Sequence, residues 1–165
     1  TRGHSDPPPG DVGTVLGNNG GRRAACMRQI RADLYQALER NRQQADPDAE
    51  ARIRAIIDGN FDITQITVPV LKTWLVFWAD SLHQPELRRL QRVNDRRLHS
   101  NLTAQFRRVL PREQARAAGA SLAAVIDGVW LRMTLASQPM EQGLQQARLL
   151  CYQNLALWLN SAPTH

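Results

Sequence analysis

Apolar residues recur at three- and four-residue steps through most of this 165-residue sequence, as Met27, Ile30 and Leu34 do in the first such segment. This spacing places apolar side chains on one face of an α-helix. Prolines and glycines interrupt the pattern between segments, and no segment shows the two-residue alternation of a strand. The sequence therefore predicts a single all-α domain. We expect six helices, at about residues 22–44, 46–59, 67–83, 85–109, 112–137 and 139–160.

The two ends of the first helix are marked by different signals. Residues 1–21 contain Pro7–Gly10 and seven further glycines and asparagines, with few apolar residues, so we expect an irregular tail. A glycine-rich phosphate loop is disfavoured, since no strand precedes this segment and no Gly-Lys-Ser or Gly-Lys-Thr ends it. After the first helix, Asp46 is expected to cap the second, with Pro47 at its first position.

The net charge of +6 comes almost entirely from arginine, because Lys72 is the only lysine. A basic chain can bind nucleic acid, but it can equally reflect a preference for arginine codons. Cys26 and Cys151 lie far apart and are expected to be reduced thiols of a cytoplasmic protein. No secretory signal is present, and the apolar runs are interrupted by charges, so we expect no membrane span. Arginines crowd the fourth predicted helix, either as a solvated face or as a nucleic-acid surface: Arg88, Arg89, Arg92, Arg96, Arg97, Arg107 and Arg108.

No set of residues predicts catalysis. The histidines are scattered, and neither a nucleophile with its base nor a metal-ligand spacing occurs. His99 is more simply read as a helix-surface residue than as a ligand contact. We therefore expect no enzyme activity, no metal and no cofactor.

The stretch from Lys72 to Leu82 holds two of the four tryptophans. On a helix, Trp74 and Trp78 share a face, with Phe77 beside them. The helix is apolar around most of its circumference, which is typical of a buried element. These indoles are either core residues or one wall of an aromatic pocket.

Three polar residues fall on otherwise apolar faces. Asn94 and Asn101 are seven residues apart in the fourth predicted helix, and Asp127 lies in the most apolar part of the fifth. A buried carboxylate requires a partner or a cation. Asp127 therefore either pairs with a neighbouring helix or a second subunit, or borders a pocket with Trp74 and Trp78. Indole faces with a nearby carboxylate can hold a quaternary ammonium group through cation–π attraction.

Several segments together resemble the TetR family of bacterial transcriptional repressors, and within it the choline-responsive repressors of glycine betaine synthesis genes. They are Ile-Ile-Asp-Gly-Asn-Phe-Asp (56–62), Thr-Trp-Leu-Val-Phe-Trp-Ala (73–79), Leu-Gln-Arg-Val-Asn-Asp-Arg-Arg-Leu (90–98), Ser-Asn-Leu (100–102) and Leu-Ala-Ala-Val-Ile-Asp-Gly-Val-Trp-Leu-Arg (122–132). The resemblance implies a six-helix ligand-binding and dimerisation domain at residues 22–160. It also implies a homodimer, in which the last two helices form a four-helix bundle with their mates.

Family members begin with a helix-turn-helix domain, and residues 1–21 stand in its place. We therefore expect this chain alone not to bind an operator specifically. The resemblance further implies choline as the inducer, with its trimethylammonium group against Trp74 and Trp78. Further candidates for the pocket are Phe61, Phe106 and Trp130 as aromatic contacts, and Asn94, Asn101 and Asp127 as partners of the hydroxyl or the charge. The alternatives are a regulator for another cationic or apolar ligand, a dimerisation module without a ligand, and a helical-bundle enzyme.

Overall fold

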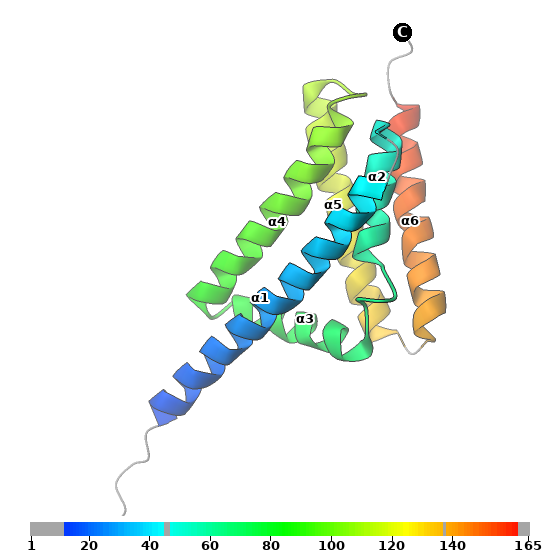
Figure 1. Ribbon diagram of the computed structural model, residues 1–165. Coiled ribbons are helices and arrows are strands. Elements are labelled where there is room, and N and C mark those ends of the chain that lie inside the picture. Colours follow the sequence, from blue (N-terminus) through cyan, green and yellow to red (C-terminus); the bar gives the residue numbers. More distant parts are fainter. Residues whose placement is uncertain (1–11, 45–46, 137, 162–165) are drawn as a thin grey trace, which may run out of the picture.

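The computed structural model describes residues 12–44, 47–136 and 138–161. These residues form six α-helices and no strand, which confirms the all-α prediction (Figure 1). The helices are α1 (Val12–Gln44), α2 (Ala49–Asn60), α3 (Val68–Ser81), α4 (Pro85–Phe106), α5 (Arg112–Leu135) and α6 (Met140–Asn160). Residues 1–11 of the expected tail lie outside the described residues.

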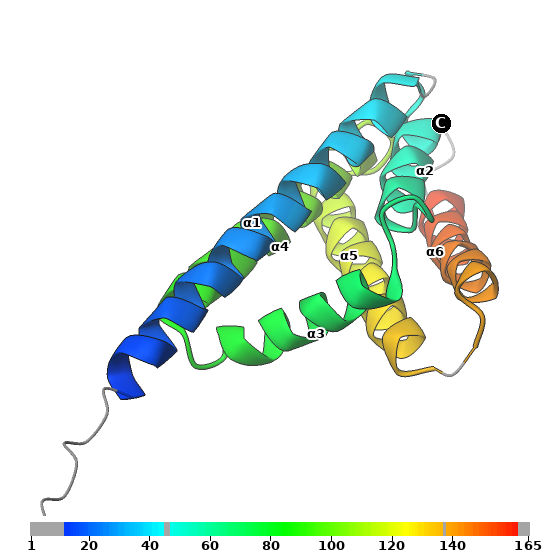
Figure 2. The ribbon, with the colours of Figure 1, turned by 60° about the horizontal axis from the view of Figure 1, so that its bottom comes forward.

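Helix α1 begins earlier than the sequence predicts. Residues 12–21, expected to be irregular, form its first turns, and these extend beyond the other helices (Figures 1 and 2). Glycine inside a helix costs about 1 kcal/mol relative to alanine, which is why the sequence argued against helix here. Once the packed part of α1 is formed, however, each added residue gains a hydrogen bond without a new nucleation cost.

Helix α2 also begins at a different residue from the one predicted. Its cap is Asp48, whose carboxylate accepts a hydrogen bond from the Ala51 amide at 3.2 Å. The prediction of Asp46 as the cap is wrong, because Asp48 stands at the correct distance from that amide; Asp46 itself lies outside the described residues. Thr67 caps α3 in the same way, through Val70.

Helix α5 lies at the centre of the domain, between α4 and α6 (Figure 1). It approaches α4 closely at Gly119, where a Cβ atom would lie only 2.3 Å from Thr103 Oγ1. On the other side α6 runs antiparallel to α5 and also touches α2, where the Tyr152 hydroxyl donates a hydrogen bond to Asp58. Small residues of α5 therefore occur both where this helix packs against α4 and on the exposed side of α5.

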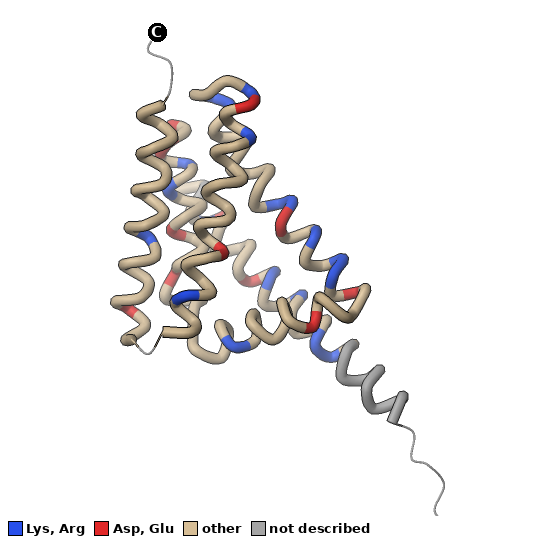
Figure 3. Tube along the Cα trace, turned by 180° about the vertical axis from the view of Figure 1, so that it is seen from behind, with Lys and Arg blue, Asp and Glu red and all other residues tan. Residues whose placement is uncertain are grey.

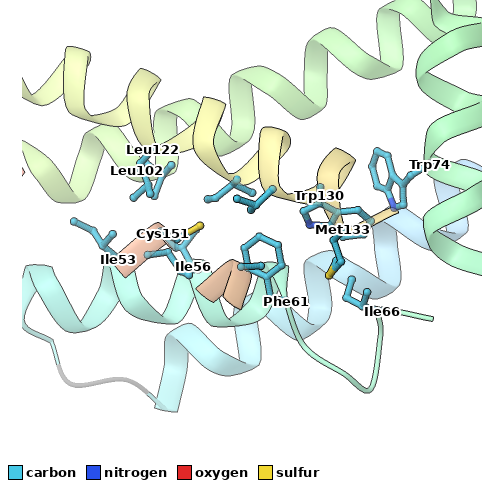
Figure 4. Packing of buried hydrophobic residues seen from close by; sticks show 14 of the residues in the cluster. Ile53, Ile56, Phe61, Ile66, Trp74, Leu102, Leu122, Trp130, Met133 and Cys151 are labelled. Carbon is cyan, nitrogen blue, oxygen red and sulfur yellow. The ribbon is translucent and has the colours of Figure 1, made fainter. Parts of the chain in front are cut away.

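A continuous core joins all six helices, and Figure 4 shows part of it between α2, α5 and α6. Phe61 and Phe106 are fully buried within it. At the periphery, α1 is tied to α3 and α4 by ion pairs from Arg23 to Asp80 and from Arg28 to Glu86. These contacts hold α1 across the domain and so position its inward face over the site described below.

Helix α5 is the one described helix that is long and apolar enough to cross a membrane by length and composition alone. The expectation that every apolar run is too short is therefore not met by α5. Eight of its residues are buried against neighbouring helices, from Ala115 to Met133. This is how the central helix of a helical domain is packed, and composition alone is weak evidence for a span.

Candidate functional site: a cavity between α1, α3, α4 and α5

A cavity of about 440 Å³ lies inside the domain, lined by residues of α1, α2, α3, α4 and α5. Figure 2 shows how α1, α3, α4 and α5 are arranged around this region. The volume lies within the range of about 300–1,000 Å³ that is usual for small-molecule sites. The cavity is lined partly by aromatic residues and partly by charged and amide side chains, so it can distinguish ligands by charge as well as by shape.

One wall of the cavity is aromatic and consists of Trp74, Trp78 and Trp130, which we call the tryptophan wall. The ring centroid of Trp74 lies 6.3 Å from that of Trp78 and 6.1 Å from that of Trp130. Trp130 is fixed in place because its Nε1 donates a buried hydrogen bond of 3.1 Å to the Asn60 carbonyl oxygen. The indole Nε1 atoms of Trp74 and Trp78 are buried, and neither has a hydrogen-bond partner among the described residues.

Six of the eight site residues expected from the sequence line this cavity: Trp74, Trp78, Asn94, Asn101, Asp127 and Trp130. The other two, Phe61 and Phe106, are absent from its lining and have no exposed surface. They are core residues, as Figure 4 shows for Phe61. Sequence reasoning could not separate them from the pocket aromatics, because a core position and a pocket position have the same helical spacing.

Asp127 is one of the two acidic residues that line the cavity. Its carboxylate forms no hydrogen bond or ion pair within the described part of the chain, so the expectation of a partner on a neighbouring helix is not met. Asp127 is an exposed residue that lines the cavity, and the protein around the cavity partly buries its carboxylate. This burial, followed by the charge of Asp95, raises the pKa of Asp127 to about 6. Near neutral pH the group is largely ionised and lacks a cationic partner.

Asn94 and Asn101 present amide groups from α4. Neither forms a hydrogen bond with another described residue, so both amides can bond to a ligand. His99, on the same helix, does not line the cavity; its Nε2 lies 3.3 Å from the Arg116 carbonyl oxygen. Among the described residues no group of three or more His, Cys, Asp or Glu side chains could hold a metal ion. The cavity offers binding groups and no recognisable nucleophile with its base.

A second part of the lining was not anticipated from the sequence. Arg31, Tyr35 and Glu39 follow one another at four-residue steps on α1, and Arg97 joins them from α4. The Arg97 guanidinium carbon lies 4.2 Å from the centre of the Tyr35 ring, in a cation–π contact. Burial, and then the charge of Arg97, lower the pKa of Arg31. We call Arg31 and Arg97 the arginine wall.

A signal for this wall was present in α1, where polar residues flank the apolar pair Leu34 and Leu38, which also line the cavity. Sequence analysis assigned Arg97 to a solvated face of the fourth helix. That interpretation holds for Arg96, which is exposed and does not line the cavity, but it is incomplete for Arg97. From the sequence of one helix alone, a side chain cannot be assigned to solvent or to a cavity, because the assignment depends on which helix packs beside it.

Comparison with known proteins identifies the relatives of the chain. Residues 47–157 match a family described as "BetI-type transcriptional repressor, C-terminal". The protein named HTH-type transcriptional regulator BetI from Burkholderia mallei is 52% identical over 132 residues, which cover 80% of this chain and 68% of that protein. The protein of the same name from Ectopseudomonas mendocina is 49% identical over 154 residues, covering 93% and 78% of the two chains.

One solved structure is similar in fold. It is that of a candidate transcriptional regulator from Pseudomonas aeruginosa PAO1, with a TM-score of 0.60 and 21% identity. The alignment covers 86% of this chain and 69% of the other. At this identity the likeness concerns the helical fold alone, and it agrees with the six-helix architecture described above.

Proposed function

The chain belongs to the family of BetI-type transcriptional repressors of the TetR class, and from this premise we propose that it senses choline. The proposal is that it forms the inducer-binding and dimerisation domain of a repressor of glycine betaine synthesis genes. Its relatives are regulators of transcription, and the chain is likewise a regulator rather than an enzyme.

The choline assignment rests on one observation: the tryptophan wall and Asp127 line the same cavity. A quaternary ammonium group has no N–H to donate, so it is recognised by aromatic faces and by charge. Cation–π attraction contributes about 0.5–2 kcal/mol per well-placed ring. Asp127 adds a carboxylate that has no ion pair within the described residues. The amide groups of Asn94 and Asn101, which line the same cavity, can bond to the hydroxyl of choline.

A titration with choline and its neutral isostere tests this proposal. In 3,3-dimethylbutan-1-ol a carbon replaces the nitrogen, so the two molecules share a shape and differ in charge. Calorimetry should show saturable choline binding and a loss of at least tenfold in affinity for the alcohol. Equal affinity would mean that the cavity selects an apolar shape. Absence of saturable heat up to millimolar choline, with tetramethylammonium saturating instead, would favour another cationic inducer.

The exposed side of α5 and α6 supports the proposal of a homodimer. It carries large apolar side chains that no described residue covers, including Leu157, which is 71% exposed, and Leu135, which is 68% exposed. The exposed residues Ala124 and Gly128 lie on the same side of α5, where they would allow close approach of another helix. Figure 3 shows that α6 has few charged residues. The large residues of this apolar face are Leu131, Leu135, Leu149, Leu150 and Leu157.

Such a face is unusual on a monomer and fits an isologous contact between two copies of the chain. Leu157→Glu should therefore convert the dimer into a monomer, measured by sedimentation velocity. Leu82→Glu is the matched control, because Leu82 is 65% exposed and follows α3, away from the α5–α6 face. A dimer that survives both substitutions would place the interface elsewhere.

We propose that a helix-turn-helix segment recognises the operator, as the name of the relatives implies. We further propose that the protein acts in the cytoplasm. Inducer binding would then favour a dimer geometry that misplaces the two DNA-binding segments. On its own, the chain should give only salt-sensitive, sequence-independent DNA binding in a mobility-shift assay. Specific binding of this chain to one DNA sequence would contradict the assignment of operator recognition to a separate helix-turn-helix segment.

A further inference from the structure

The arginine wall has features that a choline site does not explain. Arg31 and Arg97 both line the cavity, and their charges are close enough to affect the pKa of Arg31. Neither forms an ion pair within the described residues. The Arg31 Nε atom is buried and has no hydrogen-bond partner. Buried donors of this kind are normally satisfied, so each requires an explanation.

The guanidinium groups of Arg31 and Arg97 bring several N–H donors to the lining of the cavity. A quaternary ammonium group cannot accept a hydrogen bond, and the single hydroxyl of choline offers one oxygen. A carboxylate or phosphate offers several acceptor positions and a negative charge, and guanidinium groups bind both in two-pronged geometry.

The size of the cavity points in the same direction. At roughly 30 Å³ per water molecule in the liquid, about 440 Å³ corresponds to about fifteen water-sized groups. Choline has only about half that number of non-hydrogen atoms. A molecule of that size placed against the tryptophan wall leaves room for a further substituent within the same cavity.

The charges of the lining are balanced. Arg31 and Arg97 contribute two positive charges, while Asp127 and Glu39 contribute two negative ones. Glu39 accepts a hydrogen bond from Gln43 Nε2 at 3.2 Å, so it is already engaged, whereas Asp127 is not. A purely cationic ligand would bring its charge into a cavity that already holds two guanidinium groups. A ligand that carries both charges gives Asp127 a cationic partner and gives the two guanidinium groups an anionic partner.

We propose that the cavity accommodates a zwitterion, in which a quaternary ammonium group against the tryptophan wall and Asp127 is joined by a short spacer to an anionic group against Arg31 and Arg97. This inference rests on the proposed quaternary ammonium site and extends it. The ligand class is that of trimethylammonium compounds carrying a phosphate or carboxylate. The arginine wall makes the cavity discriminate between these compounds and choline.

Phosphocholine is the probe, since it equals choline with a phosphate added at the hydroxyl. In calorimetric titrations the wild-type domain should bind phosphocholine at least tenfold more tightly than choline. Arg31→Gln and Arg97→Gln should each abolish most or all of that preference by weakening phosphocholine binding tenfold or more. Choline binding should stay equal or become tighter in both variants, because a repelling charge is removed.

Arg96→Gln is the matched control, because Arg96 neighbours Arg97 in sequence and carries the same charge but faces away from the cavity. It should leave both affinities within twofold of wild type. Thermal melting of each variant shows whether the fold is intact. If Arg31→Gln does not fold, the inference is still tested by Arg97→Gln and by the ratio of the phosphocholine and choline affinities of the wild-type domain.

The outcomes separate the two proposals. Choline binding without any gain from the phosphate, or equal loss of both ligands in the arginine variants, would overturn the zwitterion inference and leave the quaternary ammonium site standing. Binding of inorganic phosphate alone, with no response to choline, would show an anion site and overturn both. No saturation by either ligand would also overturn both.

Discussion

The two walls of the cavity are built in opposite ways. The tryptophan wall belongs to the core: Trp74 and Trp130 are only 4% and 5% exposed, and Trp130 is hydrogen-bonded to the end of α2. The arginine wall is partly exposed, charged, and held mainly by the stacking of Arg97 on Tyr35. In our proposal the tryptophan wall serves stability and ligand binding together, whereas the arginine wall serves specificity and can be changed at little cost to the fold.

The largest effect is expected for Trp130→Ala. Removing a buried indole typically costs about 3–5 kcal/mol of unfolding free energy. Trp130→Phe keeps most of the volume and loses the hydrogen bond to Asn60, so it should cost about 1–2 kcal/mol. Urea denaturation of both variants measures the difference. If Trp130→Ala costs less than 1 kcal/mol, the tryptophan wall is not part of the core.

Trp78→Ala separates binding from stability on the same wall, because Trp78 is half-buried. Loss of one cation–π contact should weaken choline binding by about 2- to 30-fold, the equivalent of about 0.5–2 kcal/mol. Trp158→Ala is the control, since Trp158 is equally half-buried on α6 and does not line the cavity. Calorimetric titrations with equal loss in both variants would mean that the effect is structural.

Asp127 predicts the pH dependence of choline binding. Because burial raises its pKa to about 6, protonation below that pH removes the carboxylate that faces the cation. Affinity should therefore fall as pH decreases from 7 to 5, by up to about tenfold per unit below the pKa. Asp127→Asn should flatten the profile. Asp95→Asn should shift its midpoint to lower pH, since the Asp95 charge helps to raise this pKa.

The same group has the opposite effect on folding. The pKa of Asp127 is higher in the folded chain than its ordinary value of 3.8, so the folded state binds more protons between pH 4 and 6. Its contribution to stability accordingly decreases as pH rises through this interval. Denaturation of wild type and Asp127→Asn at pH 4 and pH 7 tests the sign. A contribution that increases with pH would mean that the carboxylate is paired.

The smallest effect on stability is expected in the arginine wall. Arg31→Gln removes a charge next to Arg97 and breaks no ion pair among the described residues. The unfolding free energy should change by about 0.5 kcal/mol or less, as at most surface positions. A loss above 2 kcal/mol in urea denaturation would show that Arg31 supports the fold, and the contrast between the two walls would disappear.

The same contrast explains what could be read from the sequence. The six helices followed from spacing and proline positions. Four-residue spacing placed Trp74 and Trp78 on one helix face but left open whether they were core or pocket residues, and Trp130 was a further candidate through the family resemblance. Phe61 and Phe106 were predicted as pocket candidates but lie in the core, because apolar spacing does not distinguish a core from a cavity. The arginine wall depends on α1 lying near α4, so that Arg97 reaches Tyr35, 62 positions away in the sequence, and no local pattern encodes this contact.

Helix ends show the same limit at smaller scale. Asp46 and Asp48 are both suitable caps, and the choice depends on which carboxylate reaches the Ala51 amide. The helical start of α1 in a glycine-rich segment depends on propagation from packed turns further along. Local preference gives the type of an element, and tertiary contacts decide its bounds.

The central claim is that the trimethylammonium group of a ligand lies against Trp74 and Trp78. An isotope-filtered NOE spectrum of the choline-saturated domain measures that proximity directly. The account predicts cross-peaks from the choline N-methyl protons to indole ring protons of both residues, lost in the Trp78→Ala variant for that ring. Bound choline with cross-peaks to other residues and to neither indole would contradict it.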